Sequence, residues 1–159
     1  MKYRNRMMAT VLLCSSYAAL AAGGGGGGGG GETVSADPVV AAAQSEIEQK
    51  NWAAAQSTLL KALAGNPQNA DYHNLYAYAL RKSANPDMDK VFSHYLEALR
   101  IDPKHRGAHE YLGEAYLMVN NLPKAREQLA ALDKLCFFGC EEYTDLKVAI
   151  AAYESRQPR

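Results

Sequence analysis

Two cysteines stand close together near the end of the chain, Cys136 and Cys140, with three residues between them. Residues four positions apart on a helical turn have Cα atoms about 6 Å apart, within the range that a disulfide bridges. A third cysteine, Cys14, falls in an N-terminal segment that is predicted to be removed. In an oxidising compartment the remaining pair is predicted to form a disulfide. Two alternatives stay open: a redox or copper-handling pair shielded by Phe137 and Phe138, or two unpaired thiols.

The spacing of the pair differs from that of common cysteine motifs. Dithiol redox sites usually hold two residues between the cysteines, and haem attachment requires Cys-x-x-Cys-His, which is absent from the sequence. The spacing therefore favours a structural bridge over a cofactor site.

His105 and His109 have the four-residue spacing of a two-histidine metal face. However, His105 follows Pro103 in a predicted turn, and His73 recurs as His109 after one sequence repeat. A position that recurs with a repeat indicates packing rather than a ligand. We therefore predict no metal site at these histidines.

The acidic residues occur in pairs that are typical of solvated or helix-capping faces: Glu46 and Glu48, Glu110 and Glu114, Glu141 and Glu142. The sequence has no Gly-x-Ser-x-Gly elbow, no phosphate-loop pattern and no His-Glu-x-x-His. We predict that the protein is not an enzyme and needs no cofactor.

These residues belong to a chain whose middle repeats itself. Four positions recur 36 residues later: Leu60, Ala62, Leu63 and Pro67 reappear as Leu96, Ala98, Leu99 and Pro103. Periods of this length are typical of stacked helical hairpins, each of which buries its apolar face against its neighbours. The predicted fold class is all-α, and the extended surface of such an array favours binding over catalysis.

Apolar residues at three- and four-residue steps predict helix pairs in three units, over about residues 36–69, 70–105 and 106–135. Asp37-Pro38 is a typical helix start. The second-helix pattern of the third unit follows that of the second by only 34 residues, which predicts a two-residue insertion near Asn85-Pro86.

A final helix is predicted over about residues 141–155, which closes a repeat domain over residues 37–155. Its apolar stripe has helical spacing: Tyr143, Leu146, Ile150 and Tyr153. Such a helix covers the exposed last face of an array, so we expect it to act as a cap.

Residues 1–21 have the layout of a secretory signal peptide, with basic residues, then an apolar run, then a small-x-small cleavage site at Ala19-Leu20-Ala21. The run is shorter than the roughly 20 residues that cross a bilayer, so cleavage is favoured over an uncleaved anchor. Residues 22–36 include nine consecutive glycines and are predicted to form a disordered linker.

Removal of residues 1–21 leaves 14 basic and 17 acidic residues, a net charge of about −3. Lysines and arginines are scattered singly, which argues against the concentrated basic face that nucleic-acid binding requires. We predict a periplasmic or secreted protein that has no membrane span after cleavage.

The register of the repeats resembles that of the tetratricopeptide repeat (TPR) family over about residues 36–135. The third unit matches the family's first helix, and two units match its second helix: Leu112, Gly113 and Tyr116; Ala55, Leu59, Ala62 and Pro67; Val91, Tyr95, Ala98 and Pro103. The resemblance implies a right-handed superhelix of about three hairpins plus the capping helix, with an inner groove lined mostly from the first helices.

Carried over position by position, the family's groove falls on mixed polar and aromatic side chains: Asn74, Tyr78, Arg81, Glu110, Glu114 and Met118. The family's basic clamp for a peptide carboxylate is not reproduced, because Val40 and Glu110 stand at its positions. The predicted function is an exported protein–protein interaction module that holds a peptide or a partner helix in this groove. The alternative is a thiol-redox or copper-handling accessory protein built on Cys136 and Cys140.

Overall fold

The computed structural model describes residues 37–156 of the chain. These residues form seven α-helices and no strand: α1 (Pro38–Glu48), α2 (Trp52–Gly65), α3 (Ala70–Lys82), α4 (Met88–Ile101), α5 (Arg106–Met118), α6 (Leu122–Leu135) and α7 (Glu141–Arg156). The predicted all-α fold class is confirmed. The predicted signal peptide and glycine-rich linker lie outside the described residues. None of the described helices combines the length and apolar character that crossing a bilayer requires.

Most helices begin at a side chain that caps free backbone N–H groups. Three asparagines accept such a bond through Oδ1 at 3.1–3.3 Å: Asn51, Asn69 and Asn121. Asp37 and Asp87 do the same for α1 and α4. Because each cap satisfies a donor that the helix itself cannot, these residues determine locally where the helices start.

The connections within the helix pairs differ in length as the repeat spacing predicts. Residues 49–51 and 119–121 join their helices with three residues each, whereas residues 83–87 use five. In both short connections the middle residue is left-handed, with φ of 57° at Lys50 and 58° at Asn120. The predicted insertion near Asn85-Pro86 is therefore confirmed.

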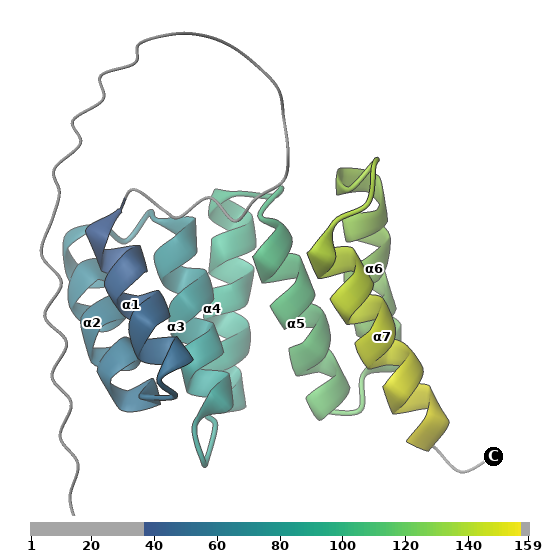
Figure 1. Cartoon of the computed structure of the whole chain (residues 1–159), viewed down its shortest axis with the longest axis horizontal. Helices are drawn as coiled ribbons and strands as arrows, with labels where there is room; N and C mark the ends of the chain where they lie inside the picture. The colour runs from purple at the N-terminus through teal and green to yellow at the C-terminus, as the bar shows by residue number, and fades with distance from the viewer. Residues whose placement is uncertain (1–36, 157–159) are drawn as a thin grey trace, which may run out of the picture.

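The helices stack in chain order as two layers, with α1, α3, α5 and α7 in one layer and α2, α4 and α6 in the other (Figure 1). Large apolar side chains from both layers are fully buried between them: Leu59, Val91, Tyr95, Leu112, Leu132 and Leu146. Each helix of the second layer packs against the first-layer helices on either side of it. The core is therefore continuous along the array, as expected of stacked hairpins.

Helix α7 occupies the place of a first-layer helix after the third pair, where it packs on α5 and α6. Leu146 and Ile150 are buried against Ala125 and Leu132 of α6. Gly113 of α5 lets α7 approach α5 closely, because a Cβ at this position would lie 2.5 Å from Leu146 Cδ2. The glycine thus serves helix–helix packing rather than a turn.

Candidate functional site

The first layer is hollowed between α3, α5 and α7. This open hollow of about 390 Å³ is lined by a mixture of apolar and charged side chains: Arg81, Lys82, Glu114, Leu117, Met118, Ala149, Ala152, Tyr153 and Arg156. We call these residues the first-layer groove. Met118 is 49% exposed there, which gives a partner an apolar surface to cover.

Arg81 is not the exposed contact that the sequence analysis expects, since only 7% of it is exposed. Its Nε donates to Tyr95 Oη at 3.3 Å, and its Nη2 donates to Glu114 Oε2 at 2.6 Å. The guanidinium carbon lies 5.4 Å and 5.7 Å from the ring centroids of Tyr78 and Tyr111. Arg81 therefore ties α3 to α4 and α5 beneath the groove.

Asn74 and Glu110 are also buried rather than displayed on the surface. Asn74 Nδ2 lies beside Gly107 in the first turn of α5, and no group of residues 37–156 bonds Asn74 Oδ1. Of the six predicted groove residues, these two and Arg81 are thus largely buried, and of the three only Arg81 lines the groove. Glu114 is half-buried, Met118 is exposed, and both line the groove.

Tyr78 is half-buried in a row of aromatic rings beside the groove. Its ring centroid is 6.3 Å from that of Trp52 and 4.7 Å from that of Tyr111. Lys82 Nζ lies 5.6 Å from the same ring. The row connects α2, α3 and α5 and leaves one part of the Tyr78 ring at the surface.

The pKa of the Glu110 carboxyl is raised to about 8, mainly by burial and then by the carboxylates of Glu114, Asp145 and Glu142, against the opposing charge of Arg81. The folded protein therefore holds the Glu110 proton at neutral pH, whereas the unfolded chain releases it near pH 4.5. Because the folded state then binds more protons, stability falls as the pH rises from about 4.5 to about 8.

Glu110→Gln should remove most of this loss, because the amide resembles the protonated carboxyl. We expect the variant to exceed the parent in stability at pH 8 by on the order of 2 to 4 kcal/mol, and to differ little at pH 4.5. Urea denaturation at the two pH values checks this, with Glu48→Gln on the exposed face of α1 as the control. Equal gains from both variants would contradict the assignment.

The part of the groove that α7 contributes is not predicted from the sequence. Ala149, Ala152, Tyr153 and Arg156 line it, although α7 was expected only to cap the array. Tyr153 also donates from its hydroxyl to Asn120 Oδ1 at 3.1 Å. The chain order could have predicted this contribution, because a helix that follows three complete pairs takes the place of a first-layer helix.

The same architecture occurs in solved structures of a secretion chaperone. Two structures of the type III secretion translocator chaperone SycD of Yersinia enterocolitica superpose with a TM-score of 0.65, at 13% and 12% sequence identity. They cover 76% and 74% of this chain, and 92% and 82% of SycD. The sequence is also 37% identical over 71 residues to tetratricopeptide repeat protein 37 of Xenopus laevis. The fold is TPR-like.

The sequence match to the Xenopus protein covers 43% of this chain and 4% of that protein. No protein-family model matches the sequence. The TPR-like assignment thus rests on the helical architecture together with this partial sequence match.

The recurring histidines are structural parts of the TPR-like array. His73 Nε2 bonds the Pro67 carbonyl at 3.0 Å, and His109 Nε2 bonds the Pro103 carbonyl at 3.1 Å. Their Nδ1 atoms face matching positions of the next helix, His94 Nδ1 and Gln128 Oε1, both at 2.8 Å. Both ring nitrogens of each recurring histidine are thus occupied.

His105 has a different role, because it caps the start of α5. Its Nδ1 accepts from the Ala108 backbone N–H at 3.1 Å, and its Nε2 pairs with Asp71 Oδ1 at 3.1 Å. The two histidines that share metal-ligand spacing, His105 and His109, therefore each bond other groups within residues 37–156.

Cys136 and Cys140 are joined by a disulfide, with an S–S distance of 2.00 Å and Cα atoms 5.5 Å apart. The two sulfur atoms and a carboxylate oxygen of Glu142 lie within 4.8 Å of one another. However, Phe137 and Phe138 point to solvent, with 87% and 97% of each residue exposed. They do not shield the sulfur atoms, so the feature that favoured a copper or redox site is missing.

Proposed function

We propose that this protein is an exported protein-binding scaffold, which holds a peptide segment or a helix of a partner protein in the first-layer groove. The single observation that carries the proposal is the open hollow between α3, α5 and α7, since exposed apolar atoms such as those of Met118 line it. Stacked hairpins use such concave surfaces to hold other molecules.

The chemistry of the groove suits a segment that is partly apolar and partly charged. Met118 and Tyr153 supply apolar area, and Lys82 and Arg156 supply basic side chains. Glu114 supplies an acidic group, although Arg81 already binds it. A partner that places an apolar side chain on Met118 and an acidic group near Lys82 would satisfy both kinds of surface.

The likeness to SycD supports binding rather than catalysis, because that protein is named as a chaperone of translocators. At 13% sequence identity, the similarity to SycD extends to the fold alone and does not identify the partner of this chain. Support for export comes from the signal-peptide layout of residues 1–21 and from a cysteine pair suited to an oxidising compartment. A periplasmic or secreted location is part of the proposal.

Met118→Glu combined with Ala152→Glu should abolish partner binding, because two carboxylates then occupy the apolar part of the groove. We expect the parent to capture partner proteins from an envelope extract of its host, and their recovery to fall at least about 30-fold with the variant, as for loss of a hot spot. Quantitative mass spectrometry of the captured fractions provides the measurement.

The matched control is Leu96→Glu, since Leu96 is 50% exposed on α4 of the second layer, close to the value for Met118. Circular dichroism should show that all variants keep the parent's helical content. Identical partners for the parent and the groove variant would refute this groove as the binding site.

A further inference from the structure

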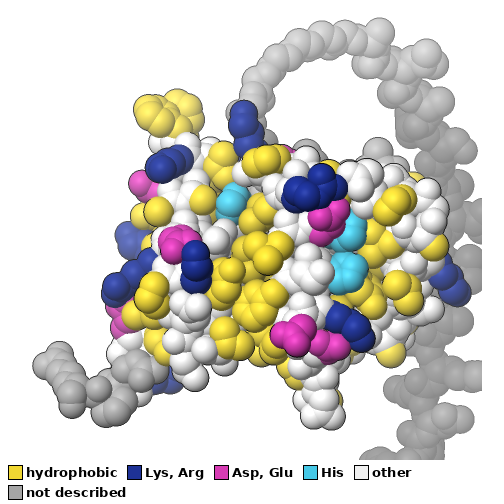
Figure 2. Space-filling model, turned by 180° about the vertical axis from the view of Figure 1, so that it is seen from behind, with side chains coloured by type: hydrophobic (Ala, Val, Ile, Leu, Met, Phe, Trp, Pro, Cys, Tyr) yellow, Lys and Arg dark blue, Asp and Glu magenta, His cyan; other side chains and the backbone are white. Residues whose placement is uncertain are grey.

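The second hairpin contains a direct contact between two histidine rings, one on α3 and one on α4. His73 Nδ1 and His94 Nδ1 lie 2.8 Å apart, and the ring centroids are separated by 5.0 Å. His73 is buried, whereas His94 is half-buried. Figure 2 shows histidine side chains that reach the surface on the side of the molecule opposite to Figure 1. Because part of His94 is exposed, protons from solvent reach the contact.

The bond on the other side of the His73 ring determines where the protons of the pair lie. The Pro67 carbonyl can only accept, so the proton of neutral His73 lies on Nε2, 3.0 Å from that oxygen. His73 Nδ1 is then the acceptor in the contact, and His94 Nδ1 is the donor. His94 Nε2 carries no proton and has no partner among residues 37–156. The neutral pair thus holds two protons, each of them in a hydrogen bond.

Acid adds protons to this pair in two steps that have different consequences. The first proton enters at His94 Nε2 and leaves the contact intact, because His94 Nδ1 still donates to His73 Nδ1. The second proton must enter at His73 Nδ1, where it faces the N–H of His94. Two donors that belong to two positively charged rings repel each other at 2.8 Å, so the second proton breaks the contact.

Few charged groups act on the pair. On α4, the Glu97 carboxylate favours the charged form of His94, although Arg100 already holds that carboxylate at 2.7 and 2.8 Å. On α3, Asp71 instead bonds a histidine at the start of α5, and the uncharged Tyr76 packs edge-to-face on His94 with ring centroids 4.7 Å apart. Within residues 37–156, no charged group of α1, α2 or α5 acts on His94.

The folded protein resists protonation of His94. Burial and then the neighbouring His73 lower the pKa of His94 below its ordinary value of 6.5, against the opposing effect of Glu97. The unfolded chain therefore binds the proton at a higher pH than the folded chain does. The stability that this contact contributes is complete above about pH 6.5 and falls as the pH drops below that value.

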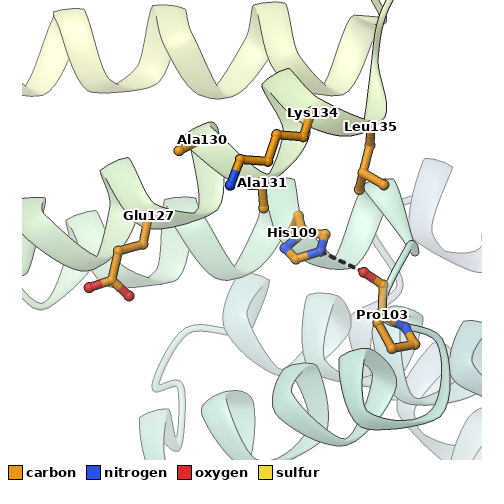
Figure 3. A pocket seen from close by; sticks show the side chains of 7 residues that line it. All are labelled: Pro103, His109, Glu127, Ala130, Ala131, Lys134 and Leu135. Carbon is orange, nitrogen blue, oxygen red and sulfur yellow. Dashed lines mark hydrogen bonds between the residues drawn. The ribbon is translucent and has the colours of Figure 1, made fainter.

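The equivalent position of the third hairpin has a partner that tolerates acid. His109 bonds the Pro103 carbonyl through Nε2, as Figure 3 shows, and its Nδ1 lies 2.8 Å from Gln128 Oε1. Both partners are oxygen atoms, so a protonated His109 donates one bond to each. Gln128 stands 34 residues after His94, the shorter spacing of the repeat. The chain thus places the same histidine once against a second histidine and once against an amide.

We propose that the His73–His94 contact is an acid-sensitive joint, which holds α3 against α4 near neutral pH and opens when both rings become charged. His73 keeps its bond to the Pro67 carbonyl in either state, so the change is confined to the contact between α3 and α4. The third hairpin stays closed, because the Gln128 amide can present either its oxygen or its nitrogen to His109. The array therefore responds to acid at one hairpin rather than along its whole length.

Exchange of the two partners tests the joint. His94→Gln gives the second hairpin the partner that the third already has, and Gln128→His does the reverse. Urea denaturation at about pH 7.5 and about pH 5 gives the folding equilibrium constant of each variant relative to the parent at the same pH. This ratio cancels contributions that all chains share, including the opposite pH dependence of Glu110.

The two variants should move in opposite directions. Between the higher and the lower pH, His94→Gln should gain about 10-fold on the parent, as for one pKa that differs by one between the folded and the unfolded chain. Gln128→His should lose about 10-fold. A substitution that only disturbs packing shifts the constant equally at both pH values, so the change of the ratio with pH is the informative quantity.

Amide hydrogen exchange locates the opening. At about pH 5, exchange in α3 and α4 should be at least about 10-fold faster in the parent than in His94→Gln, with α5 and α6 unchanged. The chain that combines His94→Gln with Gln128→His should show the fast exchange in α5 and α6 instead. A His94→Gln chain that keeps the pH dependence of the parent, or exchange that changes equally in both hairpins, would overturn the proposal. So would nitrogen NMR spectra in which His73 and His94 are both charged while α3 and α4 remain protected.

Discussion

Deletion of residues 141–159 should turn the protein into a species that aggregates, because α7 covers the last face of the array. Leu146 and Ile150 are buried on α6, and their burial contributes about 1.5 to 3 kcal/mol each before entropy is subtracted. That is a large share of the roughly 5 to 15 kcal/mol by which domains are stable. The truncated chain also exposes Leu132 and Ala125, and arrays without a cap lose solubility.

Size-exclusion chromatography and thermal denaturation provide the measurement, with Leu146→Ala as a milder test. Leu146 is fully buried, so this substitution should cost about 2 to 5 kcal/mol. Val148→Ala, two residues away on the exposed side of α7, should cost almost nothing. A truncated chain that stays soluble and melts within a degree or two of the parent would show that α7 contributes no packing energy.

Arg81→Ala should destabilise the protein by about 2 to 4 kcal/mol, an effect that its place at the groove would not suggest. The substitution leaves the buried Tyr95 hydroxyl without its bond and deprives Glu114 of its ion pair. Breaking a buried pair costs about 3 to 5 kcal/mol, and we lower the value because the Glu114 side chain remains partly solvated. Urea denaturation at neutral pH measures the difference.

Arg100→Ala is the matched control for this prediction. Arg100 pairs with Glu97 at 2.7 Å, but both side chains are substantially exposed on α4. Solvent screens exposed pairs, which contribute little to stability, so this variant should remain close to the parent. Equal losses from Arg81→Ala and Arg100→Ala would mean that burial does not distinguish the two ion pairs.

Much of the architecture follows from signals that act over a few residues. Caps such as Asp37 and Asn121 satisfy helix ends locally, and prolines such as Pro67 end them. The 36-residue period and its shortening to 34 residues therefore predict the helix pairs, the all-α class and the longer α3–α4 connection. Recurrence also identifies His73 and His109 as packing positions, because both bond the carbonyl of the preceding proline.

The exposure of the polar groove residues depends on tertiary packing. Helix α3 packs on α2 and α4 and also touches α1 and α5, so nearly all its faces are covered. Hydrophobic periodicity identifies one buried face of a helix, and it cannot predict burial of Asn74 or Arg81 on another. Likewise, only the close approach of α5 and α7 at Gly113 brings α7 into the groove. The same approach places the α7 carboxylates of Glu142 and Asp145 near Glu110. The sequence thus determines the helices and their order, and the contacts between helices determine which side chains can meet a partner.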